Sequence, residues 1–213
     1  MKHAFIAGTD TDSGKTHTTC LLLAHLQQQG RSAIGFKPVC SGGRADAQAL
    51  LTASTEGPTL DEINPCWCPT PLSPYTASLM ENRPVDVPSL VARFHALSQQ
   101  WDHVLVEGAG GWETPLSNGS TMADLAATLK LPVLLVVNNR LGALNHTLLT
   151  LRSIAAHGLP CCGILLNHPS EERDPASISN RSVLERFTSV PILGEIIHGA
   201  TDLPDFTWPG LQI

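Results

Sequence analysis

Short apolar runs alternate along the chain with segments whose apolar residues recur at helical spacing. The runs are continuous and do not alternate with polar residues, which is typical of strands covered by helices on both faces of a sheet. This pattern predicts strands at residues 3–7, 32–36, 103–106, 133–137, 162–166 and 192–196. It predicts helices at residues 16–29, 46–53, 87–100, 121–129, 143–157 and 178–187, and a long irregular surface excursion at residues 55–83.

The order of these elements predicts the fold class. Strands that alternate with helices indicate a doubly wound α/β fold, with a mainly parallel sheet flanked by helices. No internal repeat and no domain boundary is visible, so we expect one domain over residues 1–213. Ligands of such sheets bind beyond the carboxyl ends of the strands. Functional residues are therefore expected directly after the strands.

Composition and charge narrow the class of protein. The 213 residues are 42% hydrophobic and 15% charged, within the globular range. The formal net charge is -6 and no basic run occurs, so we expect neither a nucleic acid nor a membrane as partner. No signal peptide and no apolar run of about 18 residues is present, so we expect a cytoplasmic protein. Its six cysteines are expected to be reduced thiols, and Cys66-Trp67-Cys68 lacks the second pair of a zinc site.

A phosphate-binding loop follows the first predicted strand. The segment Gly8-Thr9-Asp10-Thr11-Asp12-Ser13-Gly14-Lys15-Thr16 ends with Gly-Lys-Thr at the start of a helix. Glycine lets backbone N–H groups and the helix N-terminus form an anion cradle, Lys15 adds charge for the outer phosphates, and the Thr16 hydroxyl can bind Mg²⁺. Five residues separate Gly8 from Gly14, where the usual motif has four. The Gly-Lys-Thr context nevertheless predicts a fold of the P-loop NTPase type.

Charged and amide side chains follow other predicted strands. Lys37 is either a solvated surface lysine or a cation that neutralises a transferring phosphoryl group. Asp46 opens a helix, where it either caps the helix or contributes to a Mg²⁺ site. Glu107 is either solvated or the acidic Mg²⁺ partner of a P-loop protein. Asn167 either forms a local turn or contacts the edge of a nucleobase.

Four segments together resemble the dethiobiotin synthetase family. They are Gly8–Thr16 with its five-residue spacer, Lys37-Pro38-Val39-Cys40-Ser41-Gly42, Val106–Gly111 followed by Thr114-Pro115-Leu116, and Leu141-Gly142-Ala143-Leu144-Asn145-His146. Many families share a phosphate loop, but the four segments in this order are specific. The resemblance implies an ATP- and Mg²⁺-dependent cyclo-ligase that closes 7,8-diaminononanoate and CO₂ to dethiobiotin, a step of biotin biosynthesis. The reaction would pass through a carbamate, which attacks the γ-phosphate of ATP, and a carbamic-phosphoric anhydride.

The resemblance also assigns roles to residues of this chain. Lys15, Lys37 and Thr11 would be catalytic, with Lys15 on the phosphates and Lys37 on the carbamate and the transferring phosphoryl group. The ATP site would comprise Asp12, Ser13, Gly14, Lys15, Thr16, Thr18, Glu107, Gly108, Gly110 and Asn167, with Asn167 on adenine. Thr16, Asp46 and Glu107 would hold Mg²⁺. The diamine would contact Thr11, Lys37, Ser41, Gly142, Ala143 and Asn145, at the subunit interface of a homodimer.

Two other classes of P-loop protein share parts of this pattern. Partitioning ATPases, which cycle on DNA or membrane, carry a signature lysine five residues before the P-loop lysine, and Asp10 stands at that position here. They also tend to end in an amphipathic helix, whereas residues 205–210 are not expected to be helical. Amide ligases of the same superfamily normally add a glutaminase domain, which we do not expect in this chain.

Overall fold

Six strands form the central sheet of the computed structural model, which describes residues 2–172 and 174–203. In spatial order they are β2 (Ala33–Phe36), β5 (His103–Glu107), β1 (His3–Gly8), β8 (Val133–Asn138), β9 (Cys161–Asn167) and β10 (Ile192–Ile196). Each neighbouring pair is parallel. The predicted parallel α/β fold is therefore confirmed, and each strand end lies within one residue of its prediction.

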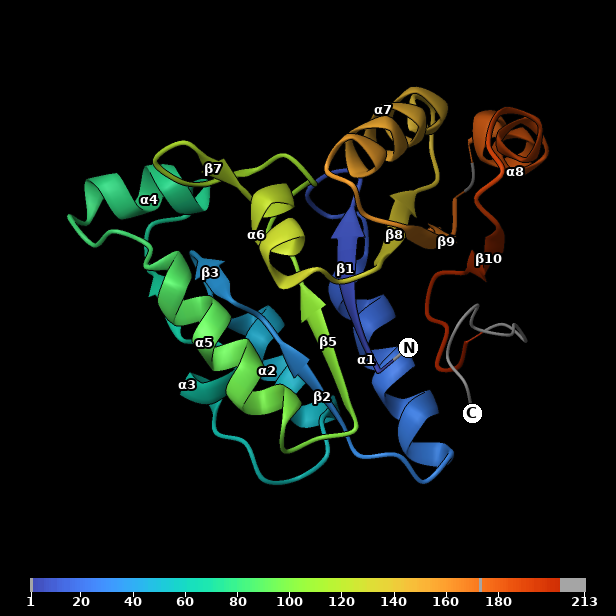
Figure 1. Ribbon diagram of the computed structural model, residues 1–213. Helices are drawn as coiled ribbons and strands as arrows, with labels where there is room; N and C mark the ends of the chain where they lie inside the picture. The colour runs from blue at the N-terminus through green and yellow to red at the C-terminus, as the bar shows by residue number, and fades with distance from the viewer. Residues whose placement is uncertain (1, 173, 204–213) are drawn as a thin grey trace.

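Helices cover both faces of this sheet (Figure 1). On one face, α1 (Lys15–Gln28) and α2 (Ala45–Ala53) bring Leu22 and Leu50 into an apolar cluster with Ile6 of β1. The other face carries α5 (Val87–Ser98), α6 (Met122–Leu129), α7 (Ala143–Ala156) and α8 (Pro175–Phe187). The six predicted helices are confirmed, although α8 begins three residues earlier than predicted. Asp174 caps it through the N–H of Ser177, with Pro175 at its first position.

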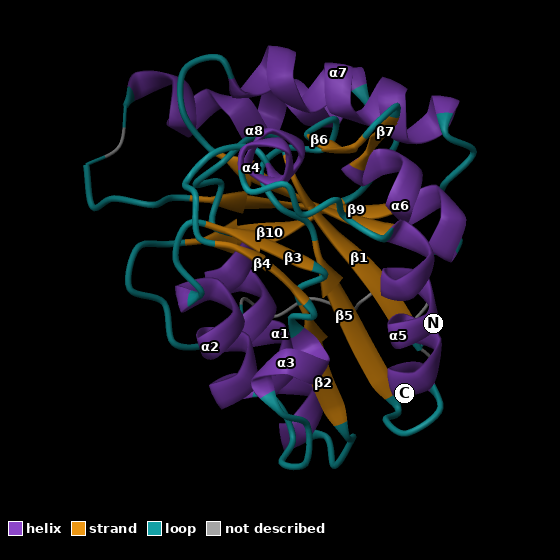
Figure 2. Ribbon diagram, turned by 90° about the vertical axis from the view of Figure 1, so that its left-hand side faces the viewer, coloured by secondary structure: helices purple, strands orange, loops and turns teal. Residues whose placement is uncertain are grey.

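The segment at residues 55–83 is more regular than the sequence predicts. It contains α3 (Leu60–Ile63), β4 (Cys66–Cys68) and α4 (Pro74–Met80). Strand β4 pairs in parallel with β3 (Val39–Ser41), and Figure 2 shows the two beside one another. The prediction of an irregular excursion was wrong because three-residue strands carry no periodicity of their own. Their pairing depends on a partner 27 residues away in the chain, as in the pair Val39 and Cys66.

A short antiparallel hairpin, β6 (Pro115–Ser117) and β7 (Ser120–Thr121), leads from the end of β5 toward α6. Within the described ranges, no helix is long and apolar enough to cross a membrane. All six cysteines lie in these ranges and are free thiols. The prediction that residues 205–210 are not helical concerns a segment outside the described residues.

Candidate functional site

The loop between β1 and α1 forms an anion cradle at the carboxyl edge of the sheet. Gly14 precedes α1 with φ 91°, no side chain caps the helix, and its first turn contains no acid. The first N–H groups of α1 are thus open to an anion. The Ser13 hydroxyl is buried and has no hydrogen-bond partner among the described residues, which fits a phosphate oxygen in the loop.

The wider spacing of this loop still produces a tight curl around Gly8. A Cβ at Gly8 would lie 2.8 Å from Lys15 Nζ and 2.9 Å from the carbonyl oxygen of Asp10. Lys15 Nζ itself donates to that carbonyl at 3.0 Å. Burial, and then the charge of Lys37, lower the pKa of Lys15 from 10.5 to about 8. A phosphate placed here would therefore meet a desolvated ammonium.

Lys37 follows β2 and lies between two carboxylates. Its Nζ donates to Glu107 Oε1 at 2.7 Å, to Asp46 Oδ2 at 3.0 Å and to the carbonyl of Gly108 at 3.2 Å. The Lys37 residue is 3% exposed, so it is not a solvated surface lysine. Burial by itself would lower its pKa, but Glu107 and Asp46 raise the pKa of Lys37 above its ordinary value. Lys37 therefore stays charged.

The structure also excludes two simpler interpretations, a helix cap for Asp46 and a solvated side chain for Glu107. The N-cap of α2 is Arg44, so Asp46 does not cap that helix. Burial would raise the pKa of Asp46, but Lys37 holds it below the ordinary value. Glu107 ends β5 fully buried and is not solvated. Its Oε1 also accepts from the hydroxyl of Thr16 at 2.7 Å.

The side chains predicted to hold Mg²⁺ are thus brought together around one cationic group. Oxygens of Asp46 and Glu107 contact the ammonium of Lys37, and Thr16 contacts Glu107. Oxygen ligands of this kind are the ones Mg²⁺ prefers. Among residues 2–172 and 174–203, no three His, Cys, Asp or Glu side chains form a metal-binding group. The donor set fits Mg²⁺ that keeps waters and binds phosphate oxygens as well.

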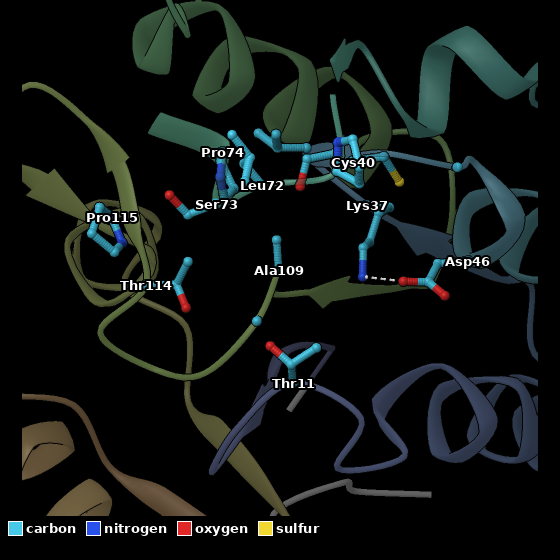
Figure 3. Close-up of a pocket in the computed structure, with 15 residues that line it drawn as sticks. Thr11, Lys37, Cys40, Asp46, Leu72, Ser73, Pro74, Ala109, Thr114 and Pro115 are labelled. Carbon is cyan, nitrogen blue, oxygen red and sulfur yellow. Dashed lines mark hydrogen bonds and ion pairs between the residues drawn. The ribbon is translucent and has the colours of Figure 1, made fainter. Parts of the chain in front are cut away.

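A cavity of about 560 Å³ adjoins this cluster (Figure 3). Its lining includes the predicted diamine contacts Thr11, Lys37 and Ser41 together with Asp46 and Gly110. Figure 3 shows Lys37 and Asp46 pointing toward one another at one side of this space. The volume suits a small-molecule site. The cavity therefore joins the phosphate loop to residues that are distant in sequence.

Asn167 lies against the phosphate loop. It ends β9, is buried, and donates from Nδ2 to the carbonyl of Ser13 at 3.1 Å. A Cβ at Gly14 would collide with its amide group. This contact spans the chain and is not a local turn. Thr18, another residue predicted for the ATP site, is fully buried in α1.

The predicted diamine contacts at the start of α7 lie outside the described lining of this cavity. Gly142 precedes α7 with φ 92° and no side-chain cap, Ala143 is buried, and Asn145 is exposed. One chain therefore brings Thr11, Lys37 and Ser41 together but not these three residues.

Two residues at the site were not predicted from the sequence. The Thr19 hydroxyl lies 2.8 Å from Glu107 Oε2, and its position three residues after Thr16 was an available signal. Trp112 is buried, donates to the hydroxyl of Ser153 at 3.0 Å and packs edge-on against Phe5. It holds the glycine-rich loop after β5 against α7, and no sequence pattern pointed to it.

The fold is similar to those of solved P-loop proteins. The septum site-determining protein MinD of Pyrococcus horikoshii, solved with Mg-ADP, superposes with a TM-score of 0.58 at 18% identity, over 92% of this chain and 81% of that one. The cell division protein FtsY of Thermotoga maritima gives a TM-score of 0.57 at 17% identity, over 96% of this chain and 65% of that one. At such identities the likeness shows the fold alone.

Sequence comparison is more specific. A family model described as an AAA domain matches residues 2–199. The ATP-dependent dethiobiotin synthetase BioD of Akkermansia muciniphila is 47% identical over 199 residues, which cover 93% of both chains. The Aromatoleum aromaticum enzyme of that name is 42% identical over 92% of this chain and 90% of its own. BioD 1 of Escherichia coli is 40% identical over 92% of this chain and 90% of its own. This chain belongs to the family of ATP-dependent dethiobiotin synthetases.

Proposed function

We propose that the protein is the cyclo-ligase that joins 7,8-diaminononanoate and CO₂ into dethiobiotin, with ATP as the driving substrate. Membership of the family supports ATP-dependent dethiobiotin formation in biotin biosynthesis. One observation carries the proposal at the level of residues. The buried ammonium of Lys37 stands where the acidic cluster meets the cavity lined by Thr11 and Ser41.

The proposed chemistry needs alignment more than a reactive side chain. One amine of the diamine adds to CO₂ and loses a proton, which gives a carbamate. A carbamate oxygen attacks the γ-phosphorus and ADP leaves, so a carbamic-phosphoric anhydride forms. The second amine then attacks the carbonyl carbon, the ureido ring closes, and phosphate leaves. The protein must hold two anions in line and spread their charge, which positioned cations achieve.

Lys15 and Lys37 supply those cations from two sides. Lys15 would exchange its bond to the Asp10 carbonyl for oxygens of the outer phosphates. Lys37 would contact the carbamate from the cavity that it lines with Thr11 and Ser41. Asn167, which already contacts the loop at Ser13, would face the adenine side.

Thr16, Asp46 and Glu107 would hold Mg²⁺. The ion, when bound, supplies charge that neutralises the phosphate oxygens during transfer. In the structure the Lys37 ammonium contacts both carboxylates. Lys37 would therefore leave them before their oxygens bind another cation, and its charge would become available to the carbamate.

We also propose that the working form is a cytoplasmic homodimer of single-domain chains. The start of α7, with Gly142 at an uncapped N-terminus and Asn145 exposed, would line the diamine site of a second copy. Leu141 and Leu149 on the same segment are 80% and 54% exposed, which supports an apolar contact there.

A phosphate-release assay tests the proposal. The protein is mixed with ATP, Mg²⁺ and bicarbonate, with and without the diamine, and dethiobiotin is measured by mass spectrometry. We expect phosphate and dethiobiotin in equal amounts, and only with the diamine. Lys37→Ala should abolish both products, whereas Arg181→Ala, at a partly exposed side chain of α8, should retain them. Phosphate release that ignores the diamine, or that responds to DNA or anionic vesicles instead, would reject the proposal.

A further inference from the structure

The hydroxyl of Thr19 contacts the oxygen of Glu107 that the other donors leave free. Lys37 Nζ and Thr16 Oγ1 both donate to Oε1 at 2.7 Å. Thr19 Oγ1 lies 2.8 Å from Oε2. Thr19 and Glu107 are both 0% exposed, so water does not compete for this contact.

The single hydroxyl hydrogen of Thr19 has two acceptors within reach. Thr19 Oγ1 lies 2.8 Å from the carbonyl of Lys15 and 2.8 Å from Glu107 Oε2. The carbonyl already accepts a backbone N–H, because residues 15 and 19 are one helical turn apart in α1. A carboxylate is also the stronger acceptor. Of the two acceptors at equal distance, the carboxylate of Glu107 is therefore the favoured one.

From this geometry we infer that Thr19 is a positioning residue that fixes the orientation of the Glu107 carboxylate for Mg²⁺. The inference rests on the proposed function, since it takes Glu107 as a metal ligand. Thr16 and Thr19 lie three residues apart on one face of α1, the helix that also begins the phosphate cradle. The branched Thr19 side chain has few rotamers in a helix, so its hydroxyl is held in place.

Thr19 matters more for the orientation of the Glu107 carboxylate once Lys37 no longer contacts Oε1. A cation that replaces Lys37 there removes one of the contacts that hold the carboxylate. The bond from Thr19 to Oε2 remains, so the carboxylate cannot rotate away. Without the hydroxyl, Oε2 would be a buried acceptor with no donor among the described residues. Groups that orient a metal ligand in this way typically change metal affinity about 10- to 100-fold when removed.

The test measures Mg²⁺ affinity by titration calorimetry of the full chain saturated with a non-hydrolysable ATP analogue. We expect Thr19→Val to weaken Mg²⁺ binding about 10- to 100-fold and Thr19→Ser to bind as the unmodified protein does. Turnover of Thr19→Val should recover at high Mg²⁺, which a merely misfolded variant would not show. Thr147→Val is the matched control, because this fully buried threonine of α7 has a hydroxyl with no partner among the described residues.

The outcomes separate this inference from the proposed function. Glu107→Gln should itself weaken Mg²⁺ binding, and adding Thr19→Val to it should cost little more. Unchanged affinity in Thr19→Val, with a loss in Glu107→Gln, overturns the positioning role alone. Unchanged affinity in Glu107→Gln overturns the metal site and the inference with it. If Thr19→Val does not fold, Thr19→Ser and Thr19→Ala differ only in the hydroxyl, and equal affinities of that pair overturn the role.

Discussion

The ammonium of Lys37 lies 2.7 Å from Glu107 Oε1, and the two side chains are 4% and 0% exposed. Lys37 compensates a carboxylate that water cannot reach. Asp46, at 3.0 Å, completes the contact from the more exposed side. The pair therefore has a structural role in addition to the catalytic role that we propose for Lys37.

Replacing Lys37 should destabilise the protein. Lys37→Ala leaves Glu107 buried with no cationic partner, which typically lowers the free energy of unfolding by about 3–5 kcal/mol. Urea unfolding in the presence of EDTA measures this loss. We expect added Mg²⁺ to restore part of the stability of the variant, since a cation returns to the carboxylates.

The control for Lys37→Ala is an exposed ion pair. Arg181→Ala removes the contacts to Glu185 at 3.1 Å and to Glu195 at 3.7 Å, and such solvent-accessible pairs each contribute about 0–1 kcal/mol. Equal losses in the two variants would show that burial of the Lys37–Glu107 pair has no consequence.

Nucleotide binding should take up a proton above pH 8. The pKa of Lys15 is lowered to about 8, so its neutral fraction grows above that pH, and phosphate favours the charged form. Calorimetric titration of an ATP analogue at pH 8.5, in two buffers of different ionisation enthalpy, should give a heat that depends on the buffer. Lys15→Arg remains charged and should lose that dependence. Equal heats for the unmodified protein in both buffers would contradict the lowered pKa.

The lowered pKa of Lys15 also determines how the free energy of unfolding changes with pH. The unfolded chain binds a proton at this group up to pH 10.5, whereas the folded chain releases it near pH 8. Between these values the unfolded state holds more protons, so the contribution of Lys15 to the free energy of unfolding increases with pH. Below pH 8 its unfavourable contribution is present in full. Urea unfolding from pH 7.5 to 10 of the unmodified protein and Lys15→Arg isolates this slope.

Gly14 should tolerate no side chain, for two separate reasons. Its φ is 91°, and a Cβ would collide with the Asn167 amide. Gly30 has φ 72° with nothing within 4 Å of an added Cβ, so Gly30→Ala reports only the cost of the backbone conformation, about 1 kcal/mol. We expect Gly14→Ala to lose more stability in urea than Gly30→Ala, and to lose nucleotide binding as well.

A double variant isolates the collision. Adding Asn167→Ala to Gly14→Ala should recover part of the lost stability, although Asn167→Ala alone removes a buried hydrogen bond. Strict additivity of the two losses would show that Gly14 and Asn167 do not constrain each other.

The cysteine thiols should react slowly in the folded protein. Burial raises the pKa of Cys20 and Cys161 to about 11 and that of Cys162 to about 12. At pH 7.5 the thiolate fraction is then roughly a hundredfold below that of a free cysteine for Cys20 and Cys161, and roughly a thousandfold below it for Cys162. An aromatic disulfide reagent should label the native protein slowly and all six thiols rapidly in urea. A thiol that labels at once in the native protein would contradict this environment.

The sequence was sufficient for the sheet because strands buried on both faces are continuous apolar runs. It was insufficient for β3 and β4, since Val39–Ser41 and Cys66–Cys68 become strands only through each other. For the site, the sequence likewise predicted individual residues but not the contact between them. The rule that ligands bind after the strands identified Lys37 and Glu107 separately. Their contact depends on β5 lying between β1 and β2, an order that no local pattern encodes.

Two features around the site, the role of Asp46 and the contacts of Trp112, depend on where side chains point in the folded protein. Asp46 near the start of α2 was compatible with a cap and with a ligand, and the structure excludes the cap because α2 is capped at Arg44 while Asp46 contacts Lys37. Trp112 was not predicted because its partners Ser153 and Phe5 come from opposite parts of the chain.

The order β2-β5-β1 also sets a molecular ruler. Lys37 follows the first of these strands, Glu107 ends the second, and the phosphate loop leaves the third. Adjacent strands lie about 4.8 Å apart, so the two outer attachment points are separated by roughly 10 Å. This separation would change only if the backbone hydrogen bonds between these strands were broken. The surrounding loops can therefore change in length without changing the distance between the attachment points of Lys37 and the phosphate loop.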